Sequence, residues 1–470
     1  MNEPCVSRDR IGIRQEVSRD EDRDQSGAQG RRRAVTGIRG TDGTLRRVAV
    51  VGTSLAGVRA AEALRRRGFQ DRLTLIGRDT DFPPHDRPPP SQAVLTGGDV
   101  DGSRLPVAPD LDAELMMNTT AEGLTLGRTP GGTGGAGGTG GTLRLSAGRT
   151  LDFDGLVIAT GAEARQPAAL VDGHPDVFVL RTFEDSLALR AALLAGPRVA
   201  VVGAGFVGCA VASHCRALGL DVTVIEEGPG PLGRVLGTAM GRELAELHRD
   251  HGTVMKTGAR AVALHPDGVE LADGTRVAAD VVVVAVGRAP RTEWLRGSGL
   301  DVEDGVLLDA TCAAAGAPRV VAAGDVARWF NPLFGAVMRV GRRSDTVEQA
   351  RAAADTLLAD GDNASPFESV PYFRSEQYES AIQFVGRGNG VPHVVEGTLA
   401  ERRFVTAYTD GQHITGALCV NRPSQLARYR RMVAARAPAD LILTPEGGQV
   451  GLPAGNLTAF ESATASTQVA

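Results

Sequence analysis

The 470-residue sequence contains little lysine, cysteine or aromatic side chain. Lys256 is the only lysine, and the five cysteines include neither a C-x-x-C pair nor the spacing of a zinc site. These absences argue against a disulfide framework, a metal centre and a dithiol redox centre. They favour a reducing compartment, and we expect the protein to be cytoplasmic.

Long apolar runs are missing as well. No stretch of about 18 apolar residues occurs, and the N-terminal end is charged and lacks the apolar centre of a signal peptide. The net charge of -5 gives no sign of nucleic-acid binding. We therefore expect a soluble protein that binds neither membranes nor nucleic acid, long enough for about three domains. The sequence leaves open whether it is a monomer or a homodimer.

Two glycine-rich turns each follow a run of apolar strand residues. They are VAVVGTSLAG at 48–57 and VAVVGAGFVG at 199–208. A strand that enters a helix through such a turn points the helix N-terminus at a pyrophosphate, and small residues let the backbone approach it. The two turns predict two dinucleotide cofactors. The second fits the pattern better, because Ser54 replaces the middle glycine of the first.

Strands and helices alternate around both turns. We expect strands at 47–52 and 72–77 with a helix at 55–67 between them, and the same order at 198–202, 206–218 and 221–225. Apolar strands that end in small residues at 156–162 and 281–287 close the two units, and another at 320–325 ends in Gly324-Asp325. This order predicts an α/β fold with two Rossmann-like domains, the second inserted into the first, and a small C-terminal α+β domain.

The order of motifs resembles that of the FAD-dependent NADH:ferredoxin reductases of the putidaredoxin-reductase type. The matching segments are RPP at 87–89, ATG at 159–161, RAPRTEWL at 288–295, AGD at 323–325, RWFNPLF at 328–334, PYF at 371–373 and VNRP at 420–423. The resemblance covers residues 46–430 and implies the domain arrangement of glutathione reductase. It also implies an oxidoreductase that passes electrons from NADH through FAD to a [2Fe–2S] ferredoxin. Hydride would pass between the cofactors, without a catalytic side chain.

The resemblance also implies domain boundaries. The FAD-binding domain would comprise 46–170 and 287–366, the NAD(H)-binding domain 171–286, and the C-terminal domain 367–450. Residues 1–45 and 451–470 are predicted to be disordered or flexible tails, because they contain few large apolar side chains. The Gly- and Thr-rich stretch 129–142 is predicted to be a flexible hairpin tip.

By resemblance, the first glycine turn and four later segments would hold FAD. The residues are Gly52, Ser54, Leu55, Ala56 and Gly57 for the ADP half, Asp79 for the adenosine ribose, Arg87 in the loop beside the flavin, Thr160 and Gly161 under the cofactor, and Gly324 and Asp325 at the ribityl chain. An alternative role for Asp325 is to cap the N-terminus of a helix.

The second turn would hold NADH. Its residues are Gly203, Gly205, Phe206, Val207 and Gly208, and Gly287 would let the nicotinamide approach the flavin. Glu226 follows about 20 residues later, where a carboxylate accepts the ribose 2′-hydroxyl and repels a 2′-phosphate. This position favours NADH over NADPH. The alternative is that Glu226 is an exposed acid at a strand end.

The sequence departs from the family around the expected flavin. Gln92 and Ala210 replace a Lys–Glu pair, Glu163 replaces an arginine, Arg342-Arg343 replace a His-Trp pair, and Arg374 replaces a tryptophan. Losing both members of a buried ion pair is tolerable, whereas losing one leaves an uncompensated charge.

Two interpretations of these changes remain open. In one, Gln92 and Arg343 contact the cofactor, while Arg342 and Arg374 add positive charge that stabilises reduced flavin or binds an anionic substrate. In the other, the arginines are solvated surface residues around a degraded flavin site. Two alternative functions follow, namely a flavoenzyme that acts directly on an anionic small molecule in a biosynthetic pathway, and a nucleotide-binding homologue that has lost electron transfer.

Overall fold

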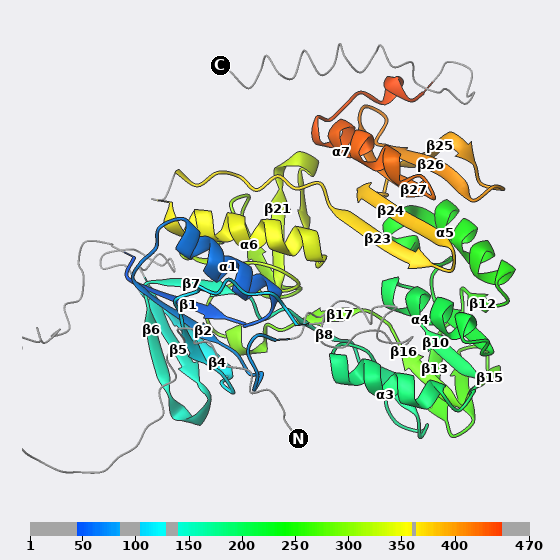
Figure 1. Ribbon diagram of the computed structural model, residues 1–470, viewed down its shortest axis with the longest axis horizontal. Coiled ribbons are helices and arrows are strands. Elements are labelled where there is room, and N and C mark those ends of the chain that lie inside the picture. Colours follow the sequence, from blue (N-terminus) through cyan, green and yellow to red (C-terminus); the bar gives the residue numbers. More distant parts are fainter. Residues whose placement is uncertain (1–44, 85–103, 128–139, 360–362, 444–470) are drawn as a thin grey trace, which may run out of the picture.

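The computed structural model describes residues 45–84, 104–127, 140–359 and 363–443. Within these ranges the chain forms two mainly parallel sheets covered by helices, called the parallel sheets below, and a separate antiparallel sheet near the C-terminus (Figure 1). The first of the two also contains antiparallel pairs at one end. This arrangement confirms the predicted α/β fold. The predicted tails at 1–45 and 451–470 and most of the hairpin tip at 129–142 lie outside the described residues, apart from Leu45 and the end of the tip.

The first sheet has nine strands in the order β22-β21-β18-β19-β20-β7-β1-β2-β3. Its central strands are parallel and buried on both faces, as expected of a sheet covered by crossover connections. The strands are β1 (Arg47–Val51), β2 (Arg72–Ile76), β3 (Glu114–Met116), β7 (Gly155–Ile158), β18 (Val306–Leu308), β19 (Ala313–Ala314), β20 (Ala317–Ala322), β21 (Ala327–Asn331) and β22 (Ala336–Met338).

Two helices lie together on one face of this sheet, α1 (Leu55–Arg66) and α6 (Arg343–Leu358) (Figure 1). Both helices carry buried alanines, including Ala60 of α1 and Ala353 of α6, and small side chains let two helices pack closely. A small antiparallel sheet, β4 (Ala121–Leu126), β5 (Gly141–Leu145) and β6 (Thr150–Phe153), lies beside β1.

The second sheet repeats the strand–turn–helix start of the first. Its order is β12-β11-β10-β16-β9, and β10 lies between β11 and β16 as β1 lies between β2 and β7. The strands are β9 (Val177–Val179), β10 (Val199–Val202), β11 (Val222–Glu226), β12 (Val254–Thr257) and β16 (Val281–Val284), with helices α3 (Phe183–Leu193), α4 (Phe206–Ala217) and α5 (Gly233–Asp250). A hairpin sheet of β13 (Ala261–His265), β14 (Gly268–Leu271) and β15 (Arg276–Ala278) packs against it.

The chain crosses between the two parallel sheets twice, through strands that pair with each other. These are β8 (Ala162–Ala164) and β17 (Arg288–Pro290), which form a two-stranded antiparallel ladder (Figure 1). The carboxyl ends of β7 and β16 therefore lead into one shared connection. Short 3₁₀ helices occur at 146–148, 168–170, 293–295, 332–334, 423–425 and 439–441.

The C-terminal sheet is antiparallel, in the order β23-β24-β27-β26-β25. One face packs against α5 and the other against α7, so this domain contacts the second parallel sheet through α5. Its elements are β23 (Tyr372–Gln377), β24 (Ser380–Gly386), β25 (Val391–Thr398), β26 (Arg403–Thr409), β27 (Ile414–Val420) and α7 (Leu426–Ala434).

Candidate active site

The first glycine turn joins β1 to α1 with almost no space for side chains. Gly52 has a φ of +120°, and a Cβ there would lie 2.1 Å from the carbonyl oxygen of Ala159. A Cβ on Gly57 would lie 1.8 Å from the carbonyl oxygen of Gly52. Both positions therefore require glycine, because α1 approaches β1 and β7 so closely.

The second turn, between β10 and α4, has the same construction. Gly203 has a φ of +100°, and a Cβ on Gly208 would lie 1.9 Å from the Gly203 carbonyl oxygen. A Cβ on Gly205, in contrast, would have no atom within 4 Å. Gly205 therefore leaves open space at the N-terminus of α4, where free N–H groups and the helix dipole attract an anion.

Glu226 ends β11 and is hydrogen-bonded to the second turn. Its Oε2 accepts a hydrogen bond from the Ala204 N–H over 2.6 Å, and its Oε1 accepts one from the Gly228 N–H over 2.7 Å. The side chain is partly buried and lies on a cavity wall. It is therefore a bound carboxylate beside the turn, not an exposed acid at a strand end.

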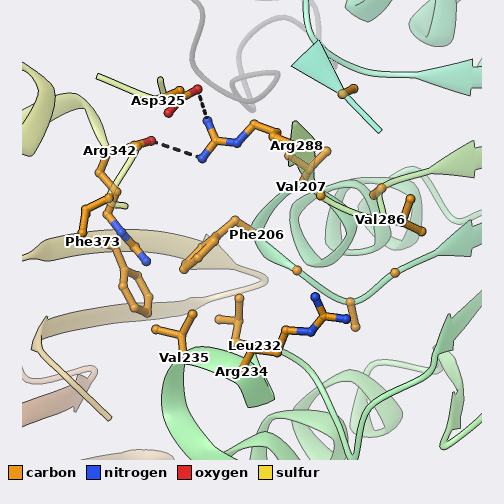
Figure 2. Close-up of a pocket in the computed structure, with 18 of the residues that line it drawn as sticks. Phe206, Val207, Leu232, Arg234, Val235, Val286, Arg288, Asp325, Arg342 and Phe373 are labelled. Atoms are coloured by element: carbon orange, nitrogen blue, oxygen red, sulfur yellow. Dashed lines mark hydrogen bonds and ion pairs between the residues drawn. The ribbon is translucent and has the colours of Figure 1, made fainter. Parts of the chain in front are cut away.

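One cavity of about 1540 Å³ reaches both glycine turns. Figure 2 shows Phe206 and Val207 of the second turn on its wall. Its wall brings together most of the residues predicted from the sequence, namely Ser54, Leu55, Ala56, Thr160, Gly161, Gly203, Gly205, Phe206, Val207, Glu226, Gly287, Gly324, Asp325, Arg342, Arg343 and Arg374. Gly287 has a φ of +102° and no atom within 4 Å of a built Cβ, so it leaves space there.

Of the predicted residues that the structure describes, four do not line this cavity. Gly52, Gly57 and Gly208 lie behind it and act through the close packing of strand and helix. Asp79 is partly buried beyond β2 and does not line the cavity. Arg87 and Gln92 lie outside the described residues.

Asp325 is bound by two arginines. Its Oδ2 accepts hydrogen bonds from Arg288 Nη1 over 2.6 Å and from Arg181 Nη2 over 3.1 Å (Figure 2 shows Arg288). Strand β21 follows Asp325, so the alternative role of this residue as a helix cap is wrong. Arg181 was not predicted, because nothing in the local sequence between β9 and α3 distinguishes it from other arginines.

The segment after β7 is tied to the returning segment. Thr160 Oγ1 donates a hydrogen bond to the Arg291 carbonyl over 2.9 Å, and the Arg291 N–H donates to the Gly161 carbonyl over 3.0 Å. Glu163 on β8 pairs with Arg291 over 3.0 Å. The carboxylate that replaces the family's arginine is thus used to join the two connecting strands.

The substituted arginines have different surroundings. The Arg342 guanidinium carbon lies 4.4 Å from the ring centroid of Phe206 and 4.3 Å from that of Phe373 (Figure 2), and burial lowers the pKa of Arg342 to about 10. Arg374 on β23 has a 57% exposed side chain that pairs with Glu376. The surface interpretation therefore fits Arg374, and the interpretation as a pocket cation fits Arg342.

Helix α4 turns Phe206, Ala210 and His214 toward the cavity at intervals of four residues. Ala210 leaves this face without a carboxylate. One turn further along, His214 is buried, its Nε2 has no hydrogen-bond partner, and burial lowers its pKa. At the start of α6, burial also lowers the pKa of Arg343.

The cysteines of the described residues do not form a redox pair. Cys209, Cys215, Cys312 and Cys419 are all free and buried, and burial raises the pKa of each thiol. A buried, protonated thiol is a poor nucleophile. Within the same part of the chain, no group of histidine, cysteine and carboxylate side chains could hold a metal ion, and no helix is long and apolar enough to cross a membrane.

Two family profiles match the chain. One, described as pyridine nucleotide-disulphide oxidoreductase, covers residues 46–356, and the other, described as reductase C-terminal, covers residues 372–442. Putidaredoxin reductase of Pseudomonas putida is 30% identical over 84% of this chain and 93% of its own length. The ferredoxin–NAD(+) reductase component of the anthranilate 1,2-dioxygenase system of Burkholderia cepacia is 34% identical over 83% and 95%.

A solved structure agrees with these sequence matches. The covalent putidaredoxin reductase–putidaredoxin complex superposes with a TM-score of 0.78 at 29% identity, over 89% of this chain and 99% of that chain. Two glycine turns that face one cavity from two parallel sheets define a two-dinucleotide oxidoreductase. The chain belongs to the pyridine nucleotide-disulphide oxidoreductase family, and within it to the FAD-dependent NADH:ferredoxin reductases. FAD and NADH are its cofactors.

Proposed function

We propose that this protein passes electrons from NADH through FAD to a [2Fe–2S] ferredoxin. The observation that carries the proposal is the single cavity whose wall contains both glycine turns. Electron transfer between two dinucleotides requires their reactive ends to meet, and a shared cavity allows this contact while excluding bulk water.

The first turn and the ends of β7 and β20 would hold FAD. Ser54, Leu55 and Ala56 line the cavity at the N-terminus of α1, where backbone N–H groups suit a pyrophosphate. Gly161 and Gly324 lie on the same wall, and each has a positive φ. A Cβ on Gly161 would have its nearest neighbour at 3.7 Å, so this position leaves room for a close approach, whereas a Cβ on Gly324 would lie 3.1 Å from the Ala56 Cβ. When bound, FAD supplies the ability to accept two electrons together and release them singly.

The second turn would hold NADH, with Gly205 open toward the pyrophosphate. Glu226 accepts one hydrogen bond from the Ala204 N–H of this turn and one from the Gly228 N–H, and its carboxylate would accept the 2′-hydroxyl of the adenosine ribose. Gly287 leaves space for the nicotinamide on the side of the returning connection. The protein would thus orient the two cofactors and keep water out, without donating a proton from a catalytic side chain.

The ferredoxin would dock beside β21 and β22. Phe330 and Val337 are cross-strand partners on this hairpin, with 39% and 49% of their surface exposed, and Val337 also lines the cavity. An exposed apolar pair next to the redox cavity suits a transient protein contact. Arg387, on the same cavity wall, lies over the Phe334 ring at 6.0 Å and adds positive charge for an acidic partner.

A second candidate is direct action on an anionic small molecule. It is supported by Arg342, Arg343 and Arg374, which all line the cavity. The ion pair of Arg374 with Glu376 and the enclosure of Arg342 by two rings weaken it, because neither guanidinium is presented freely to a solute.

The deciding experiment is an anaerobic titration of the purified protein with NADH and, separately, NADPH. We expect the flavin absorbance to bleach with one equivalent of NADH and much more slowly with NADPH. A [2Fe–2S] ferredoxin added next should restore the flavin spectrum. Binding of NADH without bleaching would instead support a homologue that has lost electron transfer, and bleaching without reoxidation by ferredoxin would favour the small-molecule enzyme.

The compartment and the assembly state of the protein can also be addressed. Four free, buried cysteines suit a reducing compartment, so we propose that the protein acts in the cytoplasm. A fractionation that finds the native protein outside the cytoplasm would contradict this. Sedimentation of the purified chain would decide between monomer and homodimer.

A further inference from the structure

Three parts of the molecule meet at Arg342. Arg342 precedes α6 on the first parallel sheet, Phe206 begins α4 on the second, and Phe373 lies on β23 of the C-terminal sheet. The two rings have centroids 4.5 Å apart in an edge-to-face arrangement, and the guanidinium lies over both (Figure 2). Cation–π contacts of this kind are strongest when water is excluded.

The rings keep the Arg342 cation away from solvent without neutralising it. Burial lowers the pKa of Arg342 to about 10, so the guanidinium stays charged at neutral pH. The charged groups that act on it are Asp345, one turn into α6, and Arg288, across the cavity wall. Asp345 is itself buried, and this burial raises its pKa to about 7. At neutral pH the carboxylate therefore compensates the cation only in part.

Arg342 also lies between the two cofactor-binding halves of the cavity. The residue before it, Gly341, packs so tightly on Asp325 that a Cβ there would lie 1.6 Å from Asp325 Oδ1. Its aromatic neighbour Phe206 directly follows Gly205 of the second turn. The cation thus connects the segment expected at the FAD ribityl chain with the turn expected to hold NADH. The reactive ends of the two cofactors must meet in this region.

We propose that Arg342 sets the reduction potential of the bound flavin by stabilising its negatively charged reduced form. Reduced flavin carries a negative charge at neutral pH, and charge near the reactive ring tunes flavin electronics. A cation held in a poorly solvated site interacts more strongly with such a charge than an exposed cation does. The inference rests on the proposed function only in placing FAD in this cavity.

The structure distinguishes Arg342 from its two neighbours in this role. Arg374 is exposed and forms an ion pair with Glu376. Solvent and the carboxylate therefore both screen its positive charge. Arg343 begins α6 and is exposed. Of these three arginines, Arg342 is the most enclosed, and the other two serve as comparisons.

The test is the midpoint potential of the bound flavin in Arg342→Gln, Arg342→Lys and the matched control Arg374→Gln. Potentials are measured by anaerobic reduction in equilibrium with reference dyes. We expect Arg342→Gln to lower the ratio of reduced to oxidised flavin at least tenfold at a fixed potential, which is about 30 mV for a two-electron couple. Arg342→Lys should retain part of the effect, and Arg374→Gln should change the ratio less than threefold.

Weak flavin binding in Arg342→Gln would not obscure the result. The ratio of the dissociation constants of reduced and oxidised FAD, obtained by titrating the apoprotein, reports the same free-energy difference. An unchanged potential and an unchanged ratio in Arg342→Gln would overturn the inference, and so would an equal shift in Arg374→Gln. The dye measurement does not use NADH. A wild-type protein that NADH cannot reduce would therefore contradict the proposed function and leave this test intact.

Discussion

Arg288 Nη1 lies 2.6 Å from Asp325 Oδ2, so the strand that returns from the second sheet is joined to the residue that follows Gly324. Arg181, from the segment that leaves β9, adds a second hydrogen bond to the same oxygen. A single carboxylate thus ties both connecting regions to the expected FAD site. The position proposed for the FAD ribityl chain is therefore held by the same contacts that join the two sheets.

Replacing Asp325 with asparagine should weaken both FAD binding and the fold. The change leaves two arginines without their shared carboxylate, and bonds to charged groups are worth about 1.5–3 kcal/mol. Because Arg288 is 40% exposed and solvent screens its share, we expect the free energy of unfolding of the apoprotein to fall by about 2 kcal/mol. Urea unfolding and the flavin-to-protein absorbance ratio measure the two effects. Asp280→Asn, at the exposed pair with Arg198, is the matched control and should leave flavin content unchanged.

Glu226→Gln should impair the use of NADH. The amide can accept only through one oxygen, so it loses one of the two backbone hydrogen bonds and the charge that favours a ribose hydroxyl. We expect KM for NADH to rise about tenfold and the preference over NADPH to narrow, as a loss of about 1.4 kcal/mol implies. Steady-state kinetics with both nucleotides provide the measurement. Glu227→Gln removes an adjacent exposed charge, and an equal effect there would count against a specific role for Glu226.

The contact between α5 and the C-terminal sheet should make stability depend on pH. His248 is fully buried, its Nδ1 lies 2.8 Å from the Tyr378 hydroxyl, and its Nε2 lies 3.1 Å from Gln377 Oε1. Burial lowers the pKa of His248 from 6.5 to about 4. The nearby titratable groups are His251, which stacks on Tyr378, and Glu379, which pairs with His251.

Between pH 6.5 and 4 the unfolded chain therefore binds a proton on His248 that the folded protein does not. The contribution of His248 to the free energy of unfolding is complete above about pH 6.5 and declines by roughly 3 kcal/mol as the pH falls to 4. Urea unfolding across this range should show a shallower pH slope for His248→Gln than for the wild type. Gln377→Leu keeps the His248 imidazole. The free energy of unfolding of this variant should therefore be lower than that of the wild type but keep the wild-type pH slope. Equal slopes for His248→Gln and wild type would refute the prediction.

Changing the exposed hairpin pair should affect only the ferredoxin step. Phe330→Ala combined with Val337→Asp removes the apolar contact from β21 and β22, and a lost contact of about 1–2 kcal/mol corresponds to a five- to thirtyfold change. We expect KM for the ferredoxin to rise by such a factor, while NADH-dependent reduction of ferricyanide stays near wild type. Leu194→Asp, which replaces an exposed leucine beyond α3, should alter neither assay. A parallel loss in both assays would place the hairpin in flavin binding instead.

The two turns show why much of the fold could be predicted from the sequence. The requirement for glycine at Gly52 and Gly203 is local, because a positive φ and a nearby carbonyl oxygen act within a few residues of the turn. The apolar runs around them are equally local, since every residue of β10 and β16 is buried. Short-range sterics and burial are thus sufficient to predict the first strand and helix of each parallel sheet and the two glycine turns proposed to bind dinucleotides.

Whether each substituted arginine is enclosed or exposed could not be predicted in this way. Arg342 and Arg374 are the same residue type, each replacing an aromatic or imidazole side chain of the family, yet one is enclosed by Phe206 and Phe373 and the other is exposed. In the sequence, Phe206 is more than a hundred residues away from both Arg342 and Phe373. Whether a cation is desolvated depends on such distant neighbours, which periodicity and spacing do not encode.

The sequence by itself determined that this chain has two dinucleotide turns, a βαβ order repeated twice and an altered set of residues around the flavin. Tertiary structure alone decided that the turns share one cavity, that Arg181 and Arg288 both bind Asp325, and that Arg342 is the cation withdrawn from water. The physical reason is that backbone sterics and apolar periodicity act over a few residues. Desolvation and charge pairing are set by the packing of segments far apart in the chain.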